Sequence, residues 1–136
     1  MIGLQEFRSK KECSERISMI TAYDYFTAKL VQQAGIDIIL VGDSLGMVVK
    51  GDNNTLGVTV DEIIYHTKAV KKGADDTFII ADLPFMSFHL NVEQAKTNSA
   101  RLIVEGGANA VKLEGGSHKP SRLLIDRDSF RLFNQI

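Results

Sequence analysis

Five polar residues stand at the ends of three consecutive apolar runs in the sequence: Asp43, Ser44, Asp82, Lys112 and Glu114. If these runs are parallel strands, their carboxyl ends meet at the edge of the sheet where α/β proteins place their active sites. Three carboxylates at one level are suitable ligands for a hard divalent cation such as Mg²⁺, which prefers oxygen. Lys112 and Glu114 are two residues apart, so in a strand they point to the same face. A lysine beside a metal ion can hold the carboxylate of a substrate.

Each of these residues also has an ordinary structural interpretation. A single aspartate after a strand is more often a helix cap or a turn residue, and a lysine in a strand is more often a solvated edge residue. Because these residues are expected at the same end of the sheet, a common binding site is favoured over separate structural roles. The glycines that follow Asp43 are not part of a P-loop, and no GxGxxG motif opens a helix. Cys13 and His66 are interpreted as structural or solvated residues.

The elements that must position these residues alternate between short apolar runs and amphipathic stretches. Helices are predicted from cap signals, which include a capping box from Thr59 to Glu62. A glycine-rich polar loop is expected over 42–57. The predicted strands are 17–21, 36–41, 77–81 and 110–113, and the predicted helices are 24–34, 59–72 and 91–105. This βαβαβαβ order predicts an α/β fold with a parallel sheet, and periodicity leaves a doubly wound sheet and a barrel both open.

Composition narrows the class of protein. The chain has 136 residues, is 44% hydrophobic and 24% charged, and has a net charge of −1, which is ordinary for a globular domain. The near-neutral charge gives no support for nucleic-acid binding. One cysteine excludes an internal disulfide, and the first 16 residues have no apolar run that resembles a signal peptide or a membrane anchor. We therefore expect a cytoplasmic protein with no nucleic-acid or membrane partner.

Five separate motifs resemble the ketopantoate hydroxymethyltransferase family in order and spacing. They are Ile20-Thr21-Ala22-Tyr23-Asp24, the stretch Leu40 to Met47, the stretch Val58 to Ile63 followed by Tyr65-His66, Ala81 to Met86, and Val111 to Gly116. The resemblance implies a (β/α)₈ TIM-barrel fold, of which residues 1–116 would be a truncated first half with about four parallel strands. The tail, 117–136, has no such resemblance, and a frameshift, a mispredicted exon or a truncated reading frame would explain it.

The resemblance also implies a function. Carried over by position, Asp43, Asp82 and Glu114 would serve a Mg²⁺ site, and Asp43, Ser44, Asp82 and Lys112 would bind the substrate. The implied reaction transfers a hydroxymethyl group from 5,10-methylenetetrahydrofolate to 3-methyl-2-oxobutanoate and gives 2-dehydropantoate, a step of pantothenate synthesis. A homo-oligomer is expected. No residue present corresponds to the general base, a glutamate that the family takes from the second half of its barrel.

Two alternatives stay open. The chain is a non-catalytic half-barrel, or it belongs to the Mg²⁺-dependent barrel enzymes related to phosphoenolpyruvate mutase and isocitrate lyase. For the 136-residue chain we expect weak Mg²⁺ binding and no measurable hydroxymethyl transfer, because a positioned base is worth about 10²–10⁴ in rate. Four strands without closure are also expected to leave the first and fourth strands with free edges, and Ile38, Leu40, Ile79 and Val111 partly uncovered.

Overall fold

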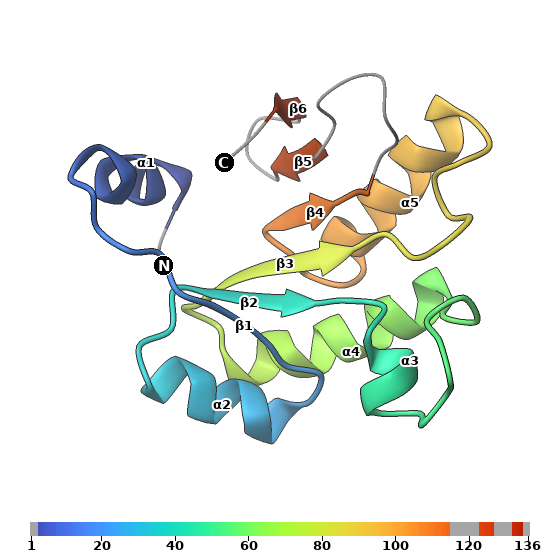
Figure 1. Ribbon diagram of the computed structural model, residues 1–136, viewed down its shortest axis with the longest axis horizontal. Helices are drawn as coiled ribbons and strands as arrows, with labels where there is room; N and C mark the ends of the chain where they lie inside the picture. The colour runs from blue at the N-terminus through green and yellow to red at the C-terminus, as the bar shows by residue number, and fades with distance from the viewer. Residues whose placement is uncertain (1–2, 115–122, 127–131, 135–136) are drawn as a thin grey trace.

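The computed structural model describes residues 3–114, 123–126 and 132–134. Its centre is a run of parallel strands that pair in chain order, which is the order of a barrel rather than the reversed order of a doubly wound sheet. These strands are β1 (Met19–Thr21), β2 (Ile38–Val41), β3 (Phe78–Asp82) and β4 (Ala110–Lys112). The predicted α/β fold with four parallel strands is confirmed (Figure 1).

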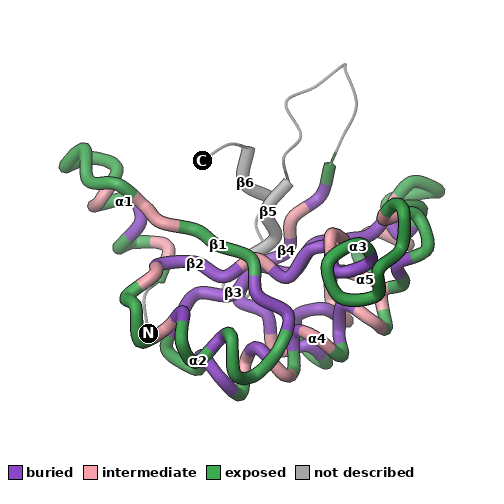
Figure 2. The backbone as a smooth tube through the Cα atoms, turned by 60° about the horizontal axis from the view of Figure 1, so that its bottom comes forward, coloured by how far each residue is buried: buried purple, intermediate pink, exposed green. Residues whose placement is uncertain are grey.

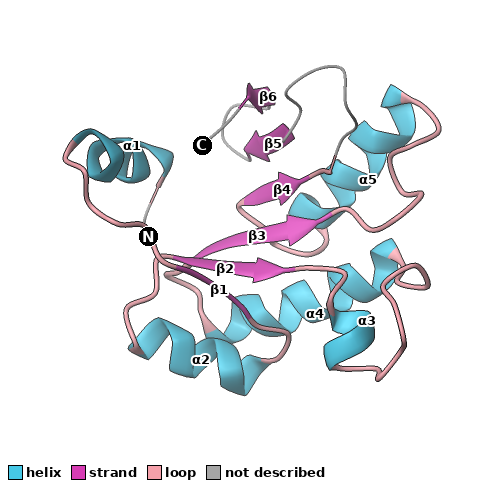
Figure 3. Ribbon diagram, viewed as in Figure 1, coloured by secondary structure: helices cyan, strands magenta, loops and turns pink. Residues whose placement is uncertain are grey.

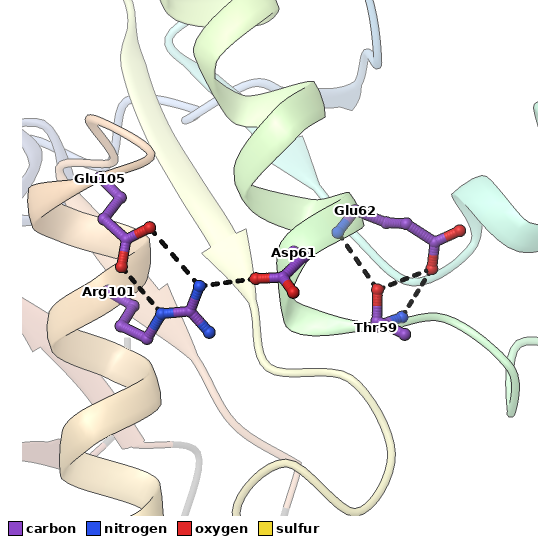
Figure 4. Close-up of polar contacts among 5 residues, drawn as sticks. All are labelled: Thr59, Asp61, Glu62, Arg101 and Glu105. Carbon is purple, nitrogen blue, oxygen red and sulfur yellow. Dashed lines mark hydrogen bonds and ion pairs between the residues drawn. The ribbon is translucent and has the colours of Figure 1, made fainter.

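Three helices connect the strands, and each begins at a predicted cap. They are α2 (Tyr25–Gln33), α4 (Val60–Gly73) and α5 (Val92–Val104). Asp24, Thr59 and Asn91 each accept a hydrogen bond from a backbone N–H of the first turn. The capping box at Thr59 is complete, because its backbone N–H donates in return to the side chain of Glu62 at 2.7 Å (Figure 4).

These helices lie together on one face of the parallel strands (Figure 3). The side chains between the two layers form the main core, in which Ile39, Ile79 and Val111 are fully buried. Helices α2 and α4 approach closely at Gly73, where an added Cβ would lie 2.2 Å from the carbonyl oxygen of Tyr25. The helices therefore fix the spacing of the strands whose ends carry the candidate site.

The opposite face of the sheet has a second, smaller core, which the sequence analysis did not anticipate. An N-terminal helix, α1 (Leu4–Glu12), lies beside the sheet and contributes one buried side chain, Phe7. Its ring packs edge-on against Phe78, with ring centroids 5.1 Å apart, and Ile38, Ile80 and Ala110 complete the cluster. The amino-terminal segment therefore covers part of the face that the other helices leave open.

Three further elements correct the sequence-based prediction. The region 42–57, expected as a loop, contains a short helix, α3 (Leu45–Val48). The prediction that the fourth strand has a free edge is wrong. β5 (Leu123–Asp126) pairs antiparallel with β4, and β6 (Leu132–Asn134) pairs with β5. The first strand does lie at one end of the sheet.

The expected exposure of apolar strand residues is also largely wrong. Ile38, Ile79 and Val111 are buried, and only Leu40 is partly exposed. The tube in Figure 2 shows this burial along β2, β3 and β4. In the part of the chain that the structure describes, no helix is both long enough and apolar enough to cross a membrane.

Candidate active site

The candidate residues converge where the parallel strands end. Asp82 is the last residue of β3 and pairs in register with Lys112, the last residue of β4. Asp43 follows β2 by two positions, and Glu114 follows β4 by two. Asp43, Asp82 and Glu114 line one cleft of about 240 Å³. The expected convergence at one end of the sheet is therefore present.

Lys112 links two of the three carboxylates. Its Nζ lies 2.6 Å from Asp82 Oδ2 and 3.1 Å from Glu114 Oε1. Burial alone would lower the pKa of Lys112, but hydrogen bonds and charge from Asp82 and Glu114 outweigh it and raise the pKa above its ordinary value. The lysine is therefore a positive charge held between two of the carboxylates that line the cleft.

Asp82 is the most perturbed acid of this cleft. It is only 5% exposed, and burial raises its pKa to about 6 although Lys112 opposes the shift. The nearby charges of Asp43 and Glu114 raise it further. Its Oδ1 atom is buried and has no hydrogen-bond partner among the described residues. A buried carboxylate oxygen without a partner is costly, so its presence at a cleft calls for a functional explanation.

Ser44 is held by a residue from another strand end. Its Oγ lies 2.7 Å from the hydroxyl of Tyr23, which follows β1. Gly42 keeps the neighbouring space free, since a Cβ there would lie 3.4 Å from Ser44 Oγ and 3.7 Å from Asp82 Oδ2. The serine hydroxyl and the aspartate carboxylate therefore border the same space.

The mouth of the cleft is aromatic and apolar. The remaining lining residues are Thr55, Leu56, Leu83, Phe85, Phe88 and His89. His89 stacks on Phe88, with ring centroids 4.1 Å apart, and its Nδ1 accepts a hydrogen bond from the backbone N–H of Met86. Phe85, Phe88 and His89 are not among the five candidate residues taken from the sequence. The signal for His89 was its place seven residues beyond Asp82, in the segment that follows β3.

The carboxylate oxygens at this site are suitable ligands for a hard cation, although the carboxylates do not lie close enough together to hold one. Among residues 3–114, 123–126 and 132–134, no three His, Cys, Asp or Glu side chains lie close enough to hold a metal ion as they stand. The ammonium of Lys112 lies between Asp82 and Glu114. Asp82 Oδ1, however, is a buried oxygen that lacks a partner, and the available donors are the oxygen ligands that Mg²⁺ prefers.

Comparison with solved structures supports the fold. The chain resembles a crystal structure of 2,3-dimethylmalate lyase, a member of the PEP mutase/isocitrate lyase superfamily, with a TM-score of 0.55 and 18% identity. The match covers 96% of this chain and 45% of the lyase. At this level of identity the likeness shows the fold alone.

Comparison with protein sequences is more specific. Residues 1–126 match the family model described as ketopantoate hydroxymethyltransferase. The chain is 58% identical over 117 residues to a 3-methyl-2-oxobutanoate hydroxymethyltransferase of Clostridium beijerinckii, and the match covers 86% of this chain and 42% of that protein. It is 60% identical over 111 residues to the protein of the same name from Bacillus subtilis, with 82% and 40% covered. The chain thus spans less than half the length of these relatives, and it belongs to the ketopantoate hydroxymethyltransferase family.

Proposed function

We propose that this chain supplies the cation- and substrate-binding part of a Mg²⁺-dependent hydroxymethyl transfer. The donor would be 5,10-methylenetetrahydrofolate, the acceptor 3-methyl-2-oxobutanoate and the product 2-dehydropantoate. The observation that carries the proposal is Asp82, which lines a cleft together with Asp43 and Glu114 and has a buried, unpartnered Oδ1. Lys112 contacts both Asp82 and Glu114. Family membership supports the choice of substrates.

In this proposal Asp43, Asp82 and Glu114 hold the cation. When bound, Mg²⁺ would supply Lewis-acid polarisation of the keto group, which makes the proton on C3 of the acid easier to remove. The carboxylates must be ionised to bind it. With a pKa of about 6, Asp82 is mostly ionised near pH 7 and becomes protonated in mild acid. Cation affinity should therefore fall as the pH drops below about 6.

Lys112 and Ser44 bind the acid. With Asp82 holding a cation, the ammonium of Lys112 would turn from Asp82 towards the carboxylate of the substrate. Because Lys112 is only partly buried, with 28% of its side chain exposed, it can make this change without unfolding β4. Ser44 donates a second hydrogen bond to an oxygen of the substrate. Together these contacts fix the acid with its C3 atom towards the mouth of the cleft.

The aromatic mouth limits the access of water. Phe85 and Leu56 line the cleft, and exclusion of water strengthens the interaction of Lys112 with a bound carboxylate. In the reaction a proton leaves C3, a bond forms between C3 and the methylene carbon, and both bonds from that carbon to the folate nitrogens break. Water supplies the oxygen of the new hydroxyl, and tetrahydrofolate leaves with the C3 proton and one proton of water on its two nitrogens. Among residues 1–116 we assign no general base for this proton.

The proposal is tested by isothermal titration of 3-methyl-2-oxobutanoate into the chain. Binding should require Mg²⁺ and be lost in excess EDTA. Asp82→Asn should abolish binding. Lys112→Met should weaken it at least about tenfold, since charge-assisted hydrogen bonds contribute about 1.5–3 kcal/mol. Lys68→Met, which removes an exposed lysine of α4, should bind as the parent does.

Two outcomes would contradict the proposal. Binding of the acid that is equal with and without Mg²⁺ would remove the role of the cation. Tighter binding of phosphoenolpyruvate than of 3-methyl-2-oxobutanoate would favour the alternative reaction class, that of phosphoenolpyruvate mutase and isocitrate lyase.

A further inference from the structure

We propose that Tyr23 is a positioning residue for substrate binding, which acts through Ser44. Its phenol holds the serine side chain so that the serine hydroxyl proton points towards Asp82, where it donates to an anionic oxygen of the bound 2-oxo acid. This inference rests on the proposed function, because it assigns a role within the same substrate site.

The contact between the two residues is short and specific. Tyr23 is only 8% exposed, and a buried phenol hydroxyl ordinarily requires a hydrogen-bond partner. The partner is Ser44 Oγ, at 2.7 Å. The two residues follow different strands, β1 and β2, so the hydrogen bond ties together two strand ends at the site.

The chemistry of the two hydroxyls determines the direction of this hydrogen bond. Either oxygen could donate, but a phenol is the more acidic hydroxyl and therefore the better donor. If Tyr23 donates, the proton of Ser44 is left for another acceptor. Within the described part of the chain Ser44 Oγ makes no other side-chain hydrogen bond. The serine is thereby prepared to donate to a ligand.

Ser44 Oγ lies on the side of Gly42 that faces Asp82, a residue of the cleft lining. The space where Gly42 lacks a side chain lies 3.4 Å from Ser44 Oγ and 3.7 Å from Asp82 Oδ2. The serine hydroxyl therefore borders the space beside the most perturbed acid of the site. An oxygen of the substrate bound near Asp82 can therefore accept from Ser44 and remain close to a cation bound at Asp82.

The backbone of Tyr23 is itself fixed on both sides. The Nδ1 atom of His66, on α4, lies 2.6 Å from the carbonyl oxygen of Tyr23. Because a carbonyl only accepts, Nδ1 must carry a proton and donate. The next residue, Asp24, caps α2 by accepting from the backbone N–H of Thr27 at 2.8 Å. These contacts hold the backbone of Tyr23 and of the residue after it, so the phenol stays within reach of Ser44.

The test compares Tyr23→Phe, which keeps the ring and removes only the hydroxyl, with Tyr65→Phe on the exposed surface of α4. Binding of 3-methyl-2-oxobutanoate is measured by calorimetry with saturating Mg²⁺, and binding of Mn²⁺ alone by electron paramagnetic resonance. Tyr23→Phe should weaken binding of the acid about 3- to 10-fold, the range expected for one hydrogen bond. It should leave the Mn²⁺ affinity unchanged, and Tyr65→Phe should change neither.

A double-mutant cycle distinguishes positioning from general packing. In a Ser44→Ala background, Tyr23→Phe should have no further effect on binding of the acid, because the residue through which it acts is gone. An equal loss in both backgrounds, or no loss in the parent background, would overturn the role of Tyr23. Failure of the parent chain to bind the acid with Mg²⁺ would instead overturn the proposed function, and this inference with it.

Discussion

Replacing Asp82 by asparagine is expected to stabilise the fold near neutral pH and to remove a pH dependence that the parent chain shows. Asp82 is 5% exposed, and burial raises its pKa to about 6 from the ordinary value of 3.8. At 1.36 kcal/mol per pH unit, this difference corresponds to about 3 kcal/mol of stability. Asparagine has nearly the same shape and no charge, so it avoids the cost of burying a carboxylate.

The sign of the effect follows from proton binding. Between about pH 4 and pH 6 the folded chain holds the proton of Asp82 more tightly than the unfolded chain does, so stability falls as the pH rises. The contribution of this group is fully present below about pH 4 and is lost above about pH 6. Asp82→Asn removes this slope. Lys112 loses the charge of Asp82 in the variant and keeps that of Glu114, so the absolute gain is smaller than the full value. The pH dependence of the difference is the diagnostic quantity.

Urea unfolding at a series of pH values measures this directly. The difference in unfolding free energy between Asp82→Asn and the parent should grow in favour of the variant from pH 4 to pH 7 and then level off. Asp75→Asn, at an exposed carboxylate, should follow the parent at every pH. Parallel curves for Asp82→Asn and the parent would refute the reasoning, because they would mean that Asp82 has the same pKa in the folded and unfolded chains.

Three further changes test how the fold is held together. Thr59→Ala removes the capping box of α4 and should lower the unfolding free energy by about 1 kcal/mol; a melting temperature equal to that of the parent would contradict this. Gly73→Ala would place a Cβ 2.2 Å from the carbonyl oxygen of Tyr25 and should cost roughly 1–3 kcal/mol in urea unfolding. Gly57→Ala, where nothing lies within 4 Å, is the control, and equal costs at the two glycines would show that the helices are not in close contact. Asp37→Ala removes a buried acceptor of backbone and hydroxyl hydrogen bonds and should cost about 1–3 kcal/mol, whereas an unchanged chemical denaturation midpoint would exclude that role.

Local sequence patterns predicted the parallel core well. The apolar run at β2 and the capping box at Thr59 involve residues that are close in sequence, so their meaning is visible without the fold. The amphipathic pattern did not predict α1, because that helix buries only Phe7 and has only one other apolar residue, Leu4. It failed for α3 because a helix of four residues has too few positions to show a period.

The candidate site, too, could be predicted from the sequence only where the signal is local. Asp82, Lys112 and Glu114 could be grouped from sequence because each stands at the end of a predicted strand. Tyr23 could not be assigned a role, since its partner Ser44 is 21 positions away and the contact depends on how β1 and β2 pair. The unpartnered oxygen of Asp82 is likewise a property of the packed structure and not of the sequence.

The central claim is that the carboxyl ends of β2, β3 and β4 hold a divalent cation, and paramagnetic broadening by Mn²⁺ tests it most directly. Backbone amide signals are recorded while Mn²⁺ is added in substoichiometric amounts. Signals of Asp43, Asp82 and Glu114 should broaden first, recover when excess Mg²⁺ competes, and remain sharp in Asp82→Asn. Broadening that is centred on the exposed carboxylates of Asp61 and Glu105, or that persists unchanged in Asp82→Asn, would contradict the claim.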